Sequence, residues 1–151
     1  MQRQAFTDRL KQALKARDAR TVSTIRLILA ELKNRDVAAR GQGNPEGLSD
    51  AEIPRMLQAM IKQRRESIAL YEQGNRHDLA QQEREEIATI ESFLPRQLDA
   101  AEIEAAVKAV IAETEAAGIK DMGKVMATLR ERHAGVIDLG QAGIIVKQLL
   151  G

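Results

Sequence analysis

Two helical patterns joined by a short break, in residues 62–98, constrain the fold of this chain more than any other feature. Apolar residues recur at helical spacing on both sides of Gly74, which predicts two long helices folded into a hairpin. Gly74 is expected to close the first helix and Asn75 to cap the second, with Asp78 at the favourable end of the helix dipole. The second helix is expected to stop before Pro95, because the residue preceding a proline avoids the helical conformation.

Charged residues fall on the apolar faces of both helices of this hairpin. Arg64 occupies a position in the first apolar stripe where an aliphatic residue is expected, and Glu83 interrupts the second stripe, with Glu86 beside it. Folding the chain at Gly74 brings Arg64 level with these two carboxylates. Because a partly buried charge is costly unless it is paired, the sequence predicts a structural ion pair from Arg64 to Glu83 or Glu86.

The rest of the chain is also typical of helices. Apolar residues at helical spacing mark two helices before the hairpin and three after it, and the polar connection GQGNPEG at 41–47 separates the first pair from the hairpin. No segment alternates with a period of two for long enough to be a strand. We therefore predict an all-α fold, with an N-terminal four-helix domain at 1–94 that contains the long hairpin and a small three-helix tail domain at 95–151.

Polar side chains that can cap helix N-termini set the expected boundaries. The expected caps are Asp18, Asp121 and Asp138, with capping boxes that begin at Ser49 and Asp99. Pro54 falls in the first turns of the third helix, so the start of that helix is less sharply defined than the others.

Charged, aromatic and proline positions recur at fixed spacing along the hairpin. They are KQRRES from Lys62, then Tyr71, Arg76-x-Asp78-Leu79, Glu83, Glu86-Ile87, and Phe93-Leu94-Pro95 with Leu98. This combination resembles the YqeY family, and the resemblance extends over essentially all 151 residues. It implies a helical fold and a class of partner more than a reaction.

The tail carries a second part of this resemblance. KDMGKVM from Lys120, then Gly135, Asp138 and Val146-Lys147 with Leu150 resemble the end of YqeY sequences and the tail domain of the GatB subunit of glutamine-dependent aminoacyl-tRNA amidotransferases. Since the GatB tail contacts tRNA, the resemblance implies a tRNA-facing surface on residues 96–151. The family often has glycine directly after the aspartate equivalent to Asp138, whereas Leu139 stands there in this chain, so that turn is expected to be built differently.

Positive charge gathers in two regions, although the net charge is only +1. Residues 1–40 hold ten Lys or Arg against four Asp or Glu, residues 41–117 eight against fifteen, and residues 118–151 five against three. A phosphate backbone is expected to bind to the positive regions, while a solvated helix face or intramolecular ion pairs are the structural alternatives. The RNA-binding candidates are Lys120, Lys124, Arg130, Arg132 and Lys147 in the tail, and Arg26, Lys33, Lys62 and Arg65 before it.

Residues that support catalysis or metal binding are sparse. The chain has no cysteine, and its two histidines, His77 and His133, have no nucleophile motif beside them. No metal-ligand spacing and no phosphate-binding glycine loop with its lysine is present, so we expect no catalytic residue, no cofactor and no metal site in this chain alone. The lack of a long apolar run and of a signal-peptide core favours a cytoplasmic protein without membrane contact.

Three functions stay open on the sequence alone. The favoured one is an accessory protein that binds tRNA or another structured RNA, without catalysis of its own. The second, implied by relatedness to GatB, is a component of a carbon–nitrogen ligase activity with glutamine as amido-N-donor, acting with a catalytic partner. The third is a protein–protein adaptor in which the apolar surface of the tail docks another chain.

Overall fold

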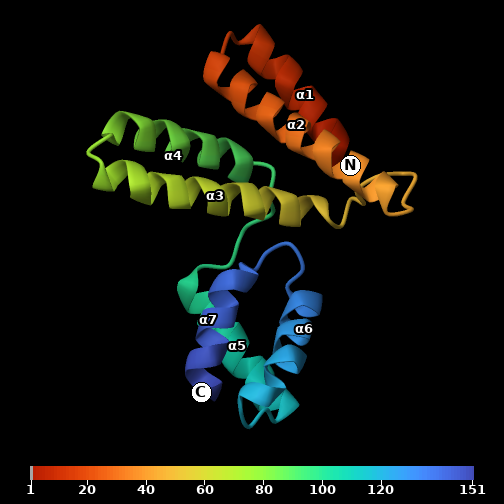
Figure 1. Cartoon of the computed structure of the whole chain (residues 1–151), viewed down its shortest axis with the longest axis vertical. Coiled ribbons are helices and arrows are strands. Elements are labelled where there is room, and N and C mark those ends of the chain that lie inside the picture. The colour runs from red at the N-terminus through yellow and green to blue at the C-terminus, as the bar shows by residue number, and fades with distance from the viewer. Residues whose placement is uncertain (1) are drawn as a thin grey trace. The chain divides into compact units, whose positions relative to one another are not determined.

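Helices form almost all of the regular structure in the computed structural model, which describes residues 2–151 (Figure 1). Over this range there are seven α-helices and one 3-10 turn, and no strand, which confirms the all-α prediction. The chain divides into two compact units, the first ending at Leu94 and the second beginning at Pro95. That each unit folds as an independent domain stays a prediction.

Unit 1 is built from two helical hairpins. The first pairs α1 (Gln2–Lys15) with α2 (Ala19–Gly41), and the second pairs α3 (Ile53–Gln73) with α4 (His77–Glu91) (Figure 1). Helix α2 packs on α4, so the apolar faces of both hairpins close on one core. The fully buried members of this core are Phe6, Ile28, Ile53, Met56, Leu57 and Ile90.

An aromatic contact joins α1 to the segment that follows α4. The rings of Phe6 and Phe93 meet edge to face with their centroids 4.9 Å apart, and the guanidinium of Arg9 lies 5.8 Å from the Phe93 ring centre. The side-chain amide of Gln2 also donates to the carbonyl of Phe93 at 2.6 Å. These contacts hold α1 against the segment that follows the second hairpin, so Phe93 has a structural role in unit 1.

Two of the predicted caps in unit 1 are wrong. Helix α3 begins at Ile53 with Pro54 in its first turn, and Glu52 stands at the N-cap without a capping side chain. The hydroxyl of Ser49 instead donates to the Glu52 carboxylate at 2.8 Å, so the expected capping box does not form. Asn75 adopts a left-handed conformation (φ 57°) that ends α3, and this backbone leaves Arg76 in the N-cap position of α4. Asp18 does cap α2, accepting from the Thr21 amide.

Unit 2 consists of α5 (Ala100–Thr114), the 3-10 turn η1 (Ile119–Asp121), α6 (Met122–Arg132) and α7 (Leu139–Leu150). Its three helices pack on one another around a core of small and medium aliphatic side chains. The fully buried members are Ile103, Val107, Val110, Val125, Leu129, Ala142 and Val146. The expected capping box from Asp99 to Glu102 is formed, and Asp138 caps α7 by accepting from the Gln141 amide.

The turn before α6 differs from its prediction. Asp121 was expected to cap α6 with its side chain, but its carboxylate accepts from the Ala117 amide at 2.9 Å, on the other side of η1. The physical reason is the tight 3-10 turn, which continues directly into α6 and directs the Asp121 side chain back along the chain. This turn positions the two lysines described next.

Candidate nucleic-acid interface

Lys120 and Lys124 stand on either side of Asp121, at the junction of η1 and α6. Both are exposed, and neither forms an ion pair with the other residues that the structure describes. The hydrogen bond from the Ala117 amide is the main cause that lowers the pKa of Asp121, and the two lysines contribute through their charge. Asp121 therefore stays ionised and holds the turn that carries both lysines.

The other three RNA-binding candidates of the tail differ in whether an ion pair already engages them. Arg130 lies on the exposed side of α6 and Lys147 on the exposed side of α7, both without an ion pair among the described residues. Arg132 instead pairs with Glu113 of α5, which ties α6 to α5. Gly143 of α7 faces the ends of Met122 and Met126 on α6, so Lys147 follows one turn after the contact between these two helices.

The candidates in unit 1 fall on two helices. Arg26 and Lys33 are exposed on α2, about 10 Å apart along its axis from their spacing of seven residues. Lys62 is exposed on α3. Arg65 lies near Glu91 of α4 at 3.5 Å, and both of these side chains are about half exposed. Such an exposed pair adds little stability and can be exchanged for a phosphate.

Arg64 lies between the carboxylates of Glu83 and Glu86, the two partners predicted for it from the sequence. Its Nε is 2.9 Å from an oxygen of Glu86 and 3.9 Å from one of Glu83, and its Nη1 donates to the Met60 carbonyl at 3.2 Å. The Arg64 and Glu86 side chains are each 13% exposed. Burial and the neighbouring charge of Glu86 raise the pKa of Glu83, while Arg64 opposes this shift. This cluster occupies the seam of the α3–α4 hairpin and is structural.

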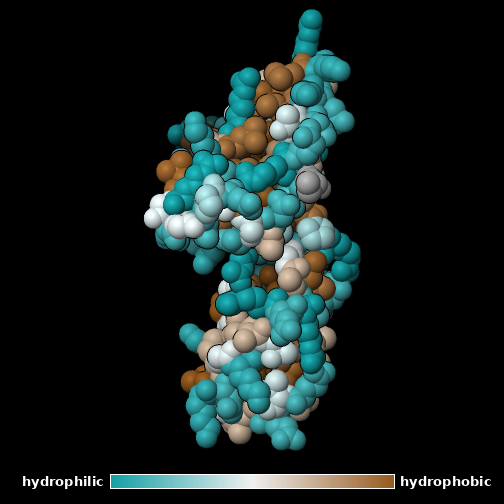
Figure 2. Space-filling model, turned by 90° about the vertical axis from the view of Figure 1, so that its right-hand side faces the viewer, coloured by the Kyte–Doolittle hydropathy of each residue, from teal (hydrophilic) through white to brown (hydrophobic). Residues whose placement is uncertain are grey.

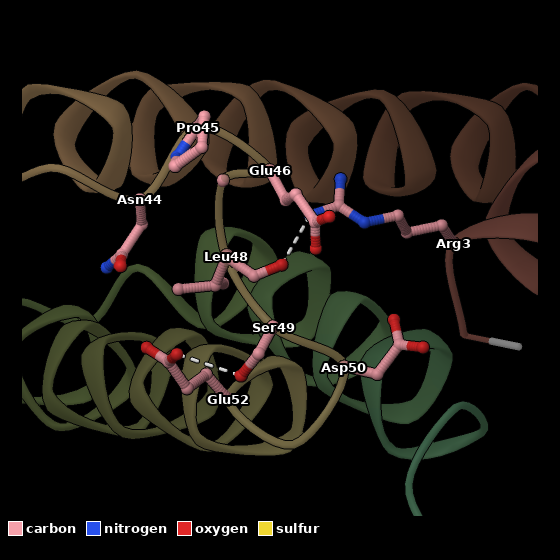
Figure 3. A pocket seen from close by; sticks show the side chains of 9 residues that line it. Arg3, Asn44, Pro45, Glu46, Leu48, Ser49, Asp50 and Glu52 are labelled. Carbon is pink, nitrogen blue, oxygen red and sulfur yellow. Dashed lines mark hydrogen bonds between the residues drawn. The ribbon is translucent and has the colours of Figure 1, made fainter.

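A second structural network, which the sequence analysis missed, ties α1 and α2 to the loop that precedes α3. Arg3 donates to both carboxylate oxygens of Asp36, at 2.9 and 2.7 Å. Arg3 also donates to the Leu48 carbonyl at 2.7 Å (Figure 3). The Leu48 amide donates to Asp36 in turn, at 2.8 Å. The sequence does contain a sign of this network, because Asp36 follows Leu32 by one turn on the buried face of α2. It is a charged residue in an apolar stripe, as Arg64 is on α3.

Arg3 and Leu48 of this network also line a hollow of about 640 Å³, together with the other residues of the loop 44–50 and with Glu52 (Figure 3). Gly47 lies at φ +82°, and a Cβ built on it would stand only 2.6 Å from Asp36. The loop therefore approaches Asp36 as closely as it does because this position is glycine. Every fully buried side-chain nitrogen and oxygen of the described residues has a hydrogen-bond partner, so the hollow presents no orphaned polar group.

Replacing Asp36 by asparagine is expected to lower the free energy of unfolding by about 1–3 kcal/mol at neutral pH, because Arg3 loses its charged partner. The hydrogen bonds from Arg3 lower the pKa of Asp36 from its ordinary 3.8 to about 2. A lowered folded-state pKa means that the contribution is complete above the ordinary pKa and is lost as the pH falls toward 2. Urea titrations from neutral pH down to that range measure the difference between the variant and the wild type. A difference that stays constant with pH would contradict this origin.

The described residues contain no group of three or more His, Asp or Glu placed to hold a metal ion. His77 is exposed at the start of α4 and His133 partly exposed at the end of α6. Among the same residues no helix combines the length and the apolar character needed to cross a bilayer.

Comparison with known proteins decides the family. The model of the YqeY family, described as Yqey-like protein, matches residues 3–150. This chain belongs to the YqeY family. The match covers both units, as the resemblance along the hairpin and the tail implied, whereas the further likeness of the tail to GatB stays a hypothesis.

Three similar curated proteins carry the name "Altered inheritance of mitochondria protein 41, mitochondrial". The one from Lachancea thermotolerans is 33% identical over 106 residues, which is 69% of this chain and 54% of the relative. The one from Vanderwaltozyma polyspora is 33% identical, and the match covers 56% of this chain and 44% of the relative. The one from Eremothecium gossypii is 32% identical, and the match covers 60% of this chain and 51% of the relative. The chain thus spans about half the length of these relatives. Their names place those proteins in mitochondria, and a cytoplasmic location for this chain stays an expectation.

Proposed function

We propose that this protein is an accessory tRNA-binding protein that has no catalysis of its own. In this proposal the RNA lies on the exposed cations of η1, α6 and α7. The resemblance of residues 120–150 to the tRNA-contacting tail of GatB supports this proposal. Because the family match does not specify a ligand, the proposal rests on the distribution of charge within unit 2.

The observation that carries the proposal is the division of the unit 2 cations into paired and unpaired ones. Arg96, Lys108 and Arg132 pair with carboxylates, whereas Lys120, Lys124, Arg130 and Lys147 are exposed and unpaired among the described residues. An unpaired exposed cation is free to neutralise a phosphate without first breaking an internal bridge. Four of the seven cations of unit 2 are therefore available to a phosphate, one on η1, two on α6 and one on α7.

The exposed face of α6 also has room for a nucleic-acid backbone. Gly123, Lys124, Ala127 and Arg130 are exposed on α6, and Glu131 is an exposed acidic residue of the same helix. A Cβ built on Gly123 would meet no atom within 4 Å, so the surface is open at that point. The small side chains of Gly123 and Ala127 leave the backbone of α6 close to the surface beside Lys124 and Arg130.

The salt dependence of binding tests this proposal. With about 3–5 phosphate contacts, the logarithm of the tRNA affinity is expected to fall with the logarithm of salt concentration at a slope of roughly −3 to −4. Gel-shift titrations of the full chain at several salt concentrations give this slope. No binding at low salt would exclude the proposal and would favour a protein partner instead.

A further inference from the structure

A second hollow lies between α1 and α2, close to the turn that joins them. Its volume is about 580 Å³, and the eight residues that line it include Ala13, Leu14, Arg17, Val22, Arg26 and Leu27. We refer to these six residues as the α1–α2 groove. Figure 2 shows hydrophobic residues at the surface near the top of the molecule, where Figure 1 places the turn between α1 and α2.

Two apolar side chains of this groove are half exposed, whereas Ala13 and Val22 beneath them are buried. Leu14 is 49% exposed and Leu27 is 44% exposed, and neither belongs to a core cluster of the described residues. Leu14 continues the apolar stripe of α1 two turns beyond Phe6, which is completely buried. The apolar stripe of α1 therefore extends beyond the part of the helix that the core of unit 1 covers. Leu14 and Leu27 thus place two half-exposed aliphatic side chains beside one hollow.

Positive charge flanks these leucines. Arg17 and Arg26 are exposed, and neither forms an ion pair within the part of the chain that the structure describes. No Asp or Glu lines the groove. The adjacent Asp18 is already engaged, because its carboxylate accepts from the amide of Thr21 at 3.2 Å and from its hydroxyl at 2.6 Å. The groove thus combines an aliphatic floor with two uncompensated guanidinium groups.

We propose that the α1–α2 groove docks an acidic amphipathic helix of a partner protein. Leucine-like side chains at positions i, i+3 and i+7 of such a helix fit an aliphatic floor between two helices. Aspartate or glutamate on its flanks satisfies Arg17 and Arg26, since guanidinium pairs with carboxylate through two parallel hydrogen bonds. RNA matches this groove less well, because base recognition uses aromatic or polar side chains and the floor here is aliphatic. The site lies in unit 1 and is separate from the tail cations proposed to bind RNA.

The probe for this proposal is a fluorescent synthetic helix of about 18 residues, with leucines along one face and glutamates on both flanks. Fluorescence anisotropy with the full chain is expected to show saturable binding. The double variant Arg17→Glu/Arg26→Glu is expected to bind at least about tenfold more weakly, since it replaces two attractions by two repulsions. Circular dichroism of the variant verifies that its helices are intact, and Leu14→Ser/Leu27→Ser provides a second, uncharged test of the same groove.

Matched controls separate this proposal from the RNA proposal. Lys120→Glu/Lys124→Glu changes the net charge equally but lies in unit 2, so it is expected to leave peptide binding within about twofold of the wild type. A peptide with lysines in place of the glutamates is expected not to bind. Absence of binding by the acidic peptide, or equal weakening by both charge reversals, would overturn the proposal. It would also be overturned if Arg17→Glu/Arg26→Glu abolished tRNA binding while the peptide still bound normally.

Discussion

Replacing Arg64 by alanine is expected to lower the free energy of unfolding by about 2–4 kcal/mol at neutral pH, the largest loss of stability predicted for this chain. Arg64 is the cation that lies between Glu83 and Glu86, and all three side chains are mostly buried. Its removal leaves two carboxylates close together in the hairpin seam with no counter-charge. Urea unfolding of the full chain, followed by circular dichroism, measures the change.

Glu83 supplies a matched control for this prediction. Because burial and Glu86 raise its pKa, its stabilising contribution is complete below its ordinary pKa and is lost as the pH rises through the raised value. Glu83→Gln is therefore expected to be neutral or stabilising at neutral pH, and to recover part of the stability lost in Arg64→Ala. An unchanged thermal melt for Arg64→Ala, or a loss in Glu83→Gln as large as that in Arg64→Ala, would contradict the assigned role of Arg64.

Reversing both lysines of the η1–α6 junction is expected to have the largest effect on RNA binding. Lys120→Glu/Lys124→Glu removes two phosphate contacts and adds two repulsive charges, so tRNA affinity at low salt is expected to fall by about tenfold or more. The slope of log affinity against log salt is expected to become shallower by about 2. Neither side chain is buried, so the melting temperature is expected to change little.

The matched control reverses two exposed cations of unit 1, Lys11 and Arg55, which the structure shows without ion pairs among the described residues. This variant carries the same net charge as Lys120→Glu/Lys124→Glu and is expected to keep most of the tRNA affinity. Equal losses in the two variants would point to a general charge effect and not to a surface on α6.

Periodicity in the sequence was sufficient to predict the helices and the seam of the hairpin. Apolar spacing depends on local geometry alone, so the helical stretches of both units could be predicted from residue order. Arg64 could be singled out for the same reason, because a charge in an apolar stripe is visible without knowing what it faces. Its partners followed from the fold at Gly74, which sets residues on the two helices opposite each other.

Other features depend on contacts between distant segments or on exact backbone angles. Asp36 could be recognised as a charge on the apolar face of α2, but its partners, Arg3 and the loop at Leu48, could not be predicted from residue order. The caps expected of Ser49, Asn75 and Asp121 failed because a proline in the first turn, a left-handed residue and a 3-10 turn changed the local backbone. The exposure of Leu14 and Leu27 also could not be predicted, since a helical stripe does not reveal where the core ends.

Ultraviolet cross-linking of tRNA to the full chain, followed by mass spectrometry of the cross-linked peptides, tests the central proposal most directly. The cross-links are expected to lie in residues 119–132 and around Lys147, on η1, α6 and α7. They are expected to disappear in Lys120→Glu/Lys124→Glu and to weaken as salt is raised. Cross-links confined to residues before Pro95, or cross-links on the tail that the double variant leaves unchanged, would contradict the proposed RNA-binding surface.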